Sequence, residues 1–331
     1  ENGLNKSAIF RGTINNGRFL WTGFGIDDLV GGKEDNLEFQ GFIKSTIDWM
    51  DTKPDVRLAN FTDQFLSPLI LTIKYNNALE PGIIDVLQSK KFTSHLIVDP
   101  TVKISKEILS RFNGDEIILD LSNFNLRDKY FSNSIKKYLD ALKLEYGLDI
   151  ETILVDQFVI DSIDERYLRE FNFDKVLVHS QVCGLPEIGD NGLMYIAFAD
   201  NQKYPKSNNE IQFFNYTPKI NCEENTEDDL LADLNLFSSQ NYNFISLSAA
   251  RDWWIIKNNL KCEIKYLLEN SIELFVSNNN SVEVNNIKLF LNAGRSSMPK
   301  NVSITSNNKL LDYDYENSSG AIAINLDKLY P

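Results

Sequence analysis

Residues 67–77 read SPLILTIKYNN, an apolar and β-branched run that begins after a serine and ends in two asparagines. Similar runs recur along the chain as far as about residue 254, with helical patterns between them. The runs are mostly apolar rather than alternating, which is typical of parallel strands in a sheet covered on both faces. The other runs are 92–98, 116–121, 152–155, 175–179, 193–198, 211–214 and 242–246.

The segments between these runs carry the spacing of amphipathic helices. Seven or eight strands alternating with helices favour a deformed (β/α) barrel over an open, doubly wound sheet. Residues 71–77 are followed by Ala78 and not by a GxGxxG loop, so a dinucleotide fold is disfavoured. The sequence therefore predicts an α/β barrel over residues 67–256. Its helices are expected at 81–90, 105–112, 132–146, 162–171 and 226–238.

The chain on either side of the predicted barrel has a different pattern. After Trp254 the helices stop, and six short strand-like runs separated by turn residues predict a small β-sandwich over 257–331. Residues 1–66 are interpreted as a lead-in segment left from a preceding domain, with extended runs at 8–13 and 18–22 and a helix at 35–50. The six C-terminal runs are 263–268, 272–276, 287–291, 302–305, 309–313 and 321–326.

Composition excludes several function classes. The 331 residues carry 33 Lys and Arg against 47 Asp and Glu, a net charge of −14. An acidic chain without a basic run is not expected to bind nucleic acid or an anionic membrane surface. No run of 18 apolar residues is present to span a bilayer. The three cysteines allow at most one disulfide, and the absence of a CxxC pair argues against the usual structural zinc site.

Candidate functional residues follow from the strand ends, because functional groups of parallel barrels lie at the carboxyl ends of the strands. Two carboxylates about 5–9 Å apart could hydrolyse a glycoside, and three could hold Ca²⁺ or Mg²⁺. The carboxylates in question are Asp99, Asp120 and Asp156. As candidate catalytic residues we take Asp120, Asp156 and His179, and as candidate substrate-binding residues Tyr75, Asn76, Asp99 and Gln157.

Each candidate also has a structural interpretation. Asp99 precedes Pro100 and is well placed to start a turn. Asp120 and Asp156 end strands, where aspartate often caps the segment that follows. His179 can be a hydrogen-bonded structural histidine, and His95 lies within an apolar run typical of a core position.

Several segments, taken in order, resemble the polysaccharide deacetylases, the chitooligosaccharide-deacetylase homology domain of the carbohydrate esterases. LTIKYNN lies where that family has its first catalytic strand, and GDEIILDLSNF resembles its GHEIGLHxxxH strand. The helix and strand between them, and the later Trp-Trp helix, resemble family segments as well. The matching segments are GRFLWTGF (17–24), FIKSTIDWMDTK (42–53), LTIKYNN (71–77), PGIIDVLQSKKFTSHLIV (81–98), GDEIILDLSNF (114–124), YLDALKLEYG (138–147) and AARDWW (249–254).

The resemblance implies a metal site that this chain does not reproduce. Family members hold a divalent metal with an aspartate and two histidines, and use a second aspartate as base and a further histidine as acid. The aspartate pair would fall near Tyr75 and Asn76, and the metal histidines at Asp120 and Phe124. Only two histidines are present where three are needed. The sequence therefore predicts no metal cofactor and no deacetylation by the family's mechanism.

Three functions remain open from the sequence. The first is a divergent deacetylase-like protein that binds or scaffolds a polysaccharide at the cell envelope, exported to the periplasm or cell surface as bacterial members mostly are. The second is a glycan hydrolase with a rebuilt site at Asp120 and Asp156. The third is an assembly protein whose β-sandwich contacts a protein partner.

Overall fold

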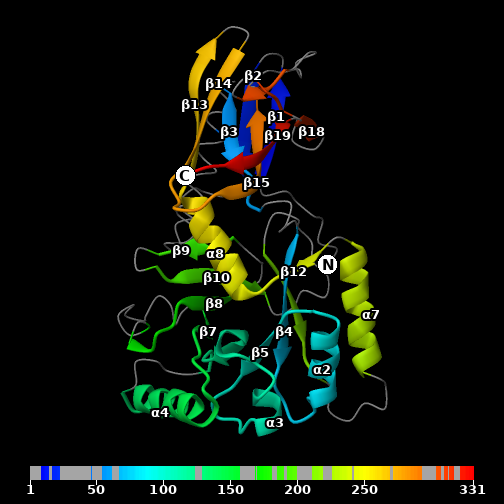
Figure 1. Cartoon of the computed structure of the whole chain (residues 1–331), viewed down its shortest axis with the longest axis vertical. Helices are drawn as coiled ribbons and strands as arrows, with labels where there is room; N and C mark the ends of the chain where they lie inside the picture. The colour runs from blue at the N-terminus through cyan, green and yellow to red at the C-terminus, as the bar shows by residue number, and fades with distance from the viewer. Residues whose placement is uncertain are drawn as a thin grey trace. The chain divides into compact units, whose positions relative to one another are not determined.

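The structure is a computed structural model of the whole chain, shown in Figure 1. Placement is described for residues 9–14, 17–22, 46, 54–61, 67–123, 129–156, 168, 170–180, 185–189, 192–199, 211–218, 226–240, 242–268, 271–292, 303–306, 309–311, 313–316 and 321–331. Most of the predicted helices at 35–50 and at 162–171 lie outside these residues.

The chain forms two compact units. Residues 63–258 make one unit, and residues 1–62 together with 259–331 make the other. Where the sequence suggested a separate lead-in over 1–66, strand β3 (Asp55–Leu58) pairs with β15 (Val284–Asn292), so both ends of the chain share one sheet. The two ends of the chain share a sheet because of hydrogen bonds between segments that are far apart in the sequence, and a local sequence pattern cannot predict such pairing.

The larger unit is built on one curled sheet that forms half a barrel (Figure 1). Its strands run in the order β11-β4-β5-β6-β7-β8-β10-β9, with β12 also paired to β4, and only β9 is antiparallel to its neighbour. Every strand predicted between 67 and 254 is confirmed, and the short strand β9, which was not predicted, is present in addition. The strands are β4 (Pro68–Lys74), β5 (Ser94–Val98), β6 (Ile117–Asp120), β7 (Thr152–Asp156), β8 (Lys175–Ser180), β9 (Glu187–Ile188), β10 (Met194–Ala199), β11 (Gln212–Tyr216) and β12 (Asn243–Phe244).

Alternation along each strand separates an outer from an inner face. On β4, Leu69, Leu71 and Ile73 belong to the core that packs beneath the helices, so Ile70 and Thr72 point to the inner side. Helices surround the outer face of the sheet (Figure 1), and their apolar side chains belong to the outer core. These helices are α2 (Pro81–Ser89), α3 (Lys106–Leu109), α4 (Lys129–Tyr146) and α7 (Thr226–Ser239), and a short 3₁₀ turn, η3 (Gly114–Glu116), precedes β6.

Aromatic side chains bridge the two sides of the curled sheet. The described parts of β10 and β11 are not hydrogen-bonded to each other, so the sheet does not close there as a complete barrel would. The rings of Phe198 on β10 and Phe213 on β11 nevertheless meet edge to face, with centroids 4.9 Å apart. Both rings are almost fully buried, and they fill the interior at the gap.

The last helix of this unit is α8 (Leu247–Asn258), which follows β12 and ends just before the second unit begins. Leu247 and Ala250 are buried, as are both of its tryptophans. No described helix is long and apolar enough to cross a membrane.

The elements of the second unit whose bounds are described are all strands. Four strands form a sheet in the order β18-β19-β15-β3, and β13 pairs with β14 in a hairpin. The face-to-face packing of two sheets that would define the expected C-terminal sandwich stays a prediction. Besides β3 and β15, the strands of the second unit are β1 (Ile9–Ile14), β2 (Gly17–Thr22), β13 (Leu260–Leu268), β14 (Ser271–Asn278), β16 (Thr305–Ser306), β17 (Lys309–Leu310), β18 (Tyr313–Glu316) and β19 (Ala321–Leu329).

Candidate functional site

A carboxylate and an imidazole lie side by side at the carboxyl ends of the central strands. Asp156 on β7 and His179 on β8 are register partners, and Phe198 on β10 is the next partner in the same row. Register partners on adjacent strands lie about 4.8 Å apart and point to the same face. The ring centroids of His179 and Phe198 are 5.5 Å apart at an interplanar angle of 74°. Phe198 therefore supports one side of the imidazole and Asp156 flanks the other.

Asp120 lies deeper than this pair. It is paired in register with Leu154, two residues before Asp156, and it is only 8% exposed. Its Oδ1 atom accepts hydrogen bonds from the Ser122 backbone N–H at 3.1 Å and from the Ser122 hydroxyl at 2.6 Å. These contacts show Asp120 stabilising the turn that follows its strand.

Asp99 and Asn76 make the same kind of local turn. The Asp99 Oδ1 atom accepts from the backbone N–H of Thr101 at 2.8 Å and from its hydroxyl at 2.7 Å. The Asn76 Oδ1 atom accepts from the Ala78 N–H at 2.9 Å, while its Nδ2 donates to the Pro218 carbonyl at 2.7 Å. Both side chains thus stabilise loops, as aspartate and asparagine commonly do.

Tyr75 fastens the loop after β5 to the end of β4. Its hydroxyl accepts a hydrogen bond from the Ser105 backbone N–H at 3.1 Å and is 3.5 Å from the Lys103 carbonyl. Its ring packs against the outer core, away from the inner face. Of the seven candidate residues, Gln157 lies outside the described residues, as does Phe124 at the second metal-histidine position.

Replacing Tyr75 by phenylalanine is expected to lower the free energy of unfolding by about 1 kcal/mol, because the Ser105 N–H loses its acceptor. Urea denaturation of the Tyr75→Phe variant measures this loss. Unchanged stability would show that the hydroxyl does not hold this loop.

The residues do not fit the metal site that the resemblance implies. Ile97 on β5 and Lys175 on β8 lie in the same register row, connected through β6 and β7. His95 lies two residues before this row on its strand, and His179 lies four residues after it, so six residues separate them along the strand direction. At about 3.3 Å per residue, the two histidines are about 20 Å apart along the strand direction. One ion cannot bind both. Tyr75 and Asn76, at the positions of the aspartate pair, are engaged in loop contacts.

Three carboxylates do not gather at the rim either. Within the described residues, no group of three His, Cys, Asp or Glu side chains is placed to hold a metal ion. The Ca²⁺ or Mg²⁺ site considered for Asp99, Asp120 and Asp156 therefore has no geometric support, because each strand carries its aspartate at a different depth or in a turn.

The opposite, amino-terminal end of the half-barrel holds a buried lysine that the sequence analysis did not single out. Lys175 is 1% exposed, and its Nζ donates to Glu151 at 3.0 Å and to Asp174 at 2.5 Å. Arg251 of α8 approaches the other oxygen of Asp174 at 3.4 Å. Alternation places Lys175 on one face with Leu177 and His179, but nothing in the sequence shows that this face is the buried, inner one.

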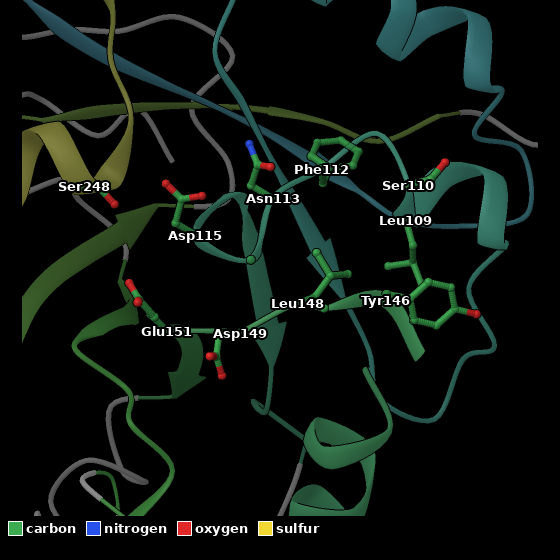
Figure 2. Close-up of a pocket in the computed structure, with 12 residues that line it drawn as sticks. Leu109, Ser110, Phe112, Asn113, Asp115, Tyr146, Leu148, Asp149, Glu151 and Ser248 are labelled. Atoms are coloured by element: carbon green, nitrogen blue, oxygen red, sulfur yellow. The ribbon is translucent and has the colours of Figure 1, made fainter. Parts of the chain in front are cut away.

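A cavity of about 790 Å³ opens beside this lysine (Figure 2). Asp115 and Glu151 lie on one side with Ser248 of α8, and Leu109 and Tyr146 lie on the other (Figure 2). Two of its carboxylates already have cationic partners: Lys143 binds Asp149 at 2.7 Å, and Lys175 binds Glu151. We assign no ligand to this cavity.

Comparisons with known proteins give little further information. No family model matches the chain, and no curated protein is similar to it. Among solved structures, it is similar to a family 4 carbohydrate esterase from Bacillus anthracis, at 17% identity and a TM-score of 0.37, over 58% of this chain and 85% of that one. At this level the similarity carries no argument about function, which must come from the residues themselves.

Proposed function

We propose that the protein binds a glycan at the carboxyl ends of the central strands and does not catalyse metal-dependent deacetylation. The observation that carries the proposal is the row of Asp156 and His179, adjacent on the inner face and both partly exposed. A carboxylate accepts hydrogen bonds from sugar hydroxyls, and an imidazole both donates and accepts them. Among the described residues, neither side chain makes a hydrogen bond that would compete with a sugar hydroxyl.

The resemblance in segment order supports a glycan as the ligand. Residues 71–77, 81–98 and 114–124 resemble deacetylase segments, and they form β4, then α2 and β5, then η3 and β6. The separation of His95 from His179 supports the loss of the metal mechanism. Export to the periplasm or cell surface is part of the same proposal and rests on the resemblance alone.

The hydrolase alternative gains no support from the geometry. It requires two free carboxylates at the rim, but Asp120 is buried and its Oδ1 is held by Ser122. A protein partner for the second unit likewise has no observation in its favour.

Substituting Asp156 or His179 by alanine is expected to weaken oligosaccharide binding at least about tenfold. A hydrogen bond to a charged group is worth about 1.5–3 kcal/mol, and 1.4 kcal/mol is tenfold in Kd. Isothermal titration with chitooligosaccharides and with their deacetylated forms measures the effect. Asp140→Ala is the matched control, since Asp140 is exposed on α4.

Two results would contradict the proposal. Equal affinity of Asp156→Ala, His179→Ala and the native chain would place any binding elsewhere. Release of acetate from chitooligosaccharides that increases on adding Zn²⁺ or Co²⁺ would show that the metal mechanism is retained.

A further inference from the structure

His95 connects the inside of the half-barrel to the first residue of α8. The imidazole is fully buried, and its Nε2 atom accepts a hydrogen bond from the Leu247 backbone N–H at 3.1 Å. An Nε2 atom that accepts carries no proton, so the ring is neutral with its proton on Nδ1. The contact therefore exists only while His95 is uncharged.

The surroundings of His95 oppose a positive charge. Burial lowers the pKa of His95 to about 4, and the charge of Lys175 on β8 adds to the effect, against a small opposing contribution from the Asp115 backbone in η3. The amino-terminal end of α8, with its positive helix dipole, faces the ring at Leu247.

Glu116, Arg251 and Lys175, which are charged groups on the neighbouring elements, have partners, and Asp115 of η3 lines the cavity beside Ser248. Glu116 of η3 accepts from the Asn113 N–H at 2.8 Å, and burial raises its pKa. Arg251 of α8 pairs with Asp174, and Lys175 pairs with Glu151 and Asp174. Among the described residues, His95 Nδ1 has no hydrogen-bonded side-chain partner. In the described structure, a proton added to His95 would therefore have no carboxylate as a direct hydrogen-bond partner.

We propose that His95 is a pH-sensitive latch, which holds α8 against the half-barrel while the ring is neutral and releases the helix when the ring is protonated. Protonation converts the acceptor of the Leu247 N–H into a donor. Two donors then face each other, and the new charge lies at the amino terminus of α8. Both effects push α8 away, while the charge of Lys175 opposes protonation of the ring.

The contacts around Ser246 keep α8 folded as a helix when it separates from the half-barrel. The Ser246 hydroxyl accepts from the Ala249 N–H and its carbonyl from the Ala250 N–H, each at 3.0 Å, so α8 is capped without His95. Just before it, Asn243 N–H donates to the Ser67 carbonyl at 3.1 Å and Ile245 N–H to the Leu69 carbonyl at 3.0 Å. The chain stays anchored to β4, so release pivots near Ser246 and moves Ser248 out of the cavity wall.

Hydrogen exchange followed by mass spectrometry between pH 7 and pH 4 tests the latch, with rates corrected for the intrinsic pH dependence. A folded-state pKa of about 4 against an ordinary 6.5 means that neutral His95 stabilises docking above pH 6.5 and that this is lost as the pH falls towards 4. We expect at least about hundredfold faster exchange in peptides of 247–258 at pH 4, with β4 to β7 still protected.

Two variants separate the latch from general acid unfolding. His95→Gln keeps an acceptor for the Leu247 N–H but cannot be protonated, so its α8 peptides should stay protected at pH 4. Lys175→Met removes the nearby positive charge and brings the docked pKa of His95 closer to 6.5, so the factor by which exchange of its α8 peptides rises between pH 7 and pH 4 should be smaller than in the native chain, even if His95→Gln does not fold. Exchange of α8 together with the sheet, or the same factor in Lys175→Met as in the native chain, would overturn the proposal.

Discussion

Gly114→Ala is expected to lower the free energy of unfolding of the larger unit by about 3 kcal/mol or more. A Cβ atom at Gly114 would overlap the Asp149 carbonyl oxygen and lie 2.7 Å from the Asp149 backbone nitrogen. These are backbone atoms directly before β7, so they cannot rotate away as a side chain can. The turns that lead into β6 and β7 would have to separate, and overpacking of this kind typically costs about 1–3 kcal/mol or more.

Thermal denaturation measures the loss, and Gly82→Ala is the matched control. For a unit of 63–258, 3 kcal/mol corresponds to a fall in Tm of about 6–12 °C. Gly82 lies in α2 with no atom within 4 Å of an added Cβ, so alanine there should raise stability by up to about 1 kcal/mol. Similar Tm values for the two variants would mean that the close approach at Gly114 is absent in solution.

Lys175→Ala is the second large effect, expected to cost about 3 kcal/mol of unfolding free energy. The substitution leaves a cavity in the inner face and removes the cation from Glu151 and Asp174. Breaking a buried pair typically costs about 3–5 kcal/mol, and we take the lower end because both carboxylates are partly exposed. Asp174 also keeps Arg251 as a partner.

Chemical denaturation of Lys175→Ala beside Lys143→Ala isolates the effect of burial. Lys143 binds Asp149 at 2.7 Å, but both side chains are more than half exposed, at 61% and 63%. An exposed pair of this kind contributes at most about 1 kcal/mol. Equal losses in the two variants would contradict the inward placement of Lys175.

The strands and their faces could be predicted from the sequence because local patterns encode them. Apolar runs such as 67–77 and 175–179 mark strands covered on both sides, and because successive side chains of a strand point to opposite faces, position along the run divides the residues between two faces. The turn-forming interpretation of Asp99 and Asp120 was likewise available, since an aspartate at a strand end can bond to backbone N–H groups two residues on.

The candidate site could be predicted only in part. The end of each strand supplied Asp156 and His179, but their pairing depends on which strands are neighbours. Phe198 was not selected, because a phenylalanine in an apolar run is indistinguishable from any other core residue until its ring is placed against His179. Lys175 was read as the first residue of a strand, with no sign of burial.

By itself, the sequence determined the alternation of strands and helices, and it left two histidines where the metal site implied by the resemblance needs three. Tertiary structure decided the rest. It placed His95 and His179 at different depths in the sheet, joined β3 to β15, and left β10 and β11 bridged by aromatic rings. Propensity and periodicity act over a few residues, whereas strand register and sheet order are set by hydrogen bonds between segments far apart in the chain.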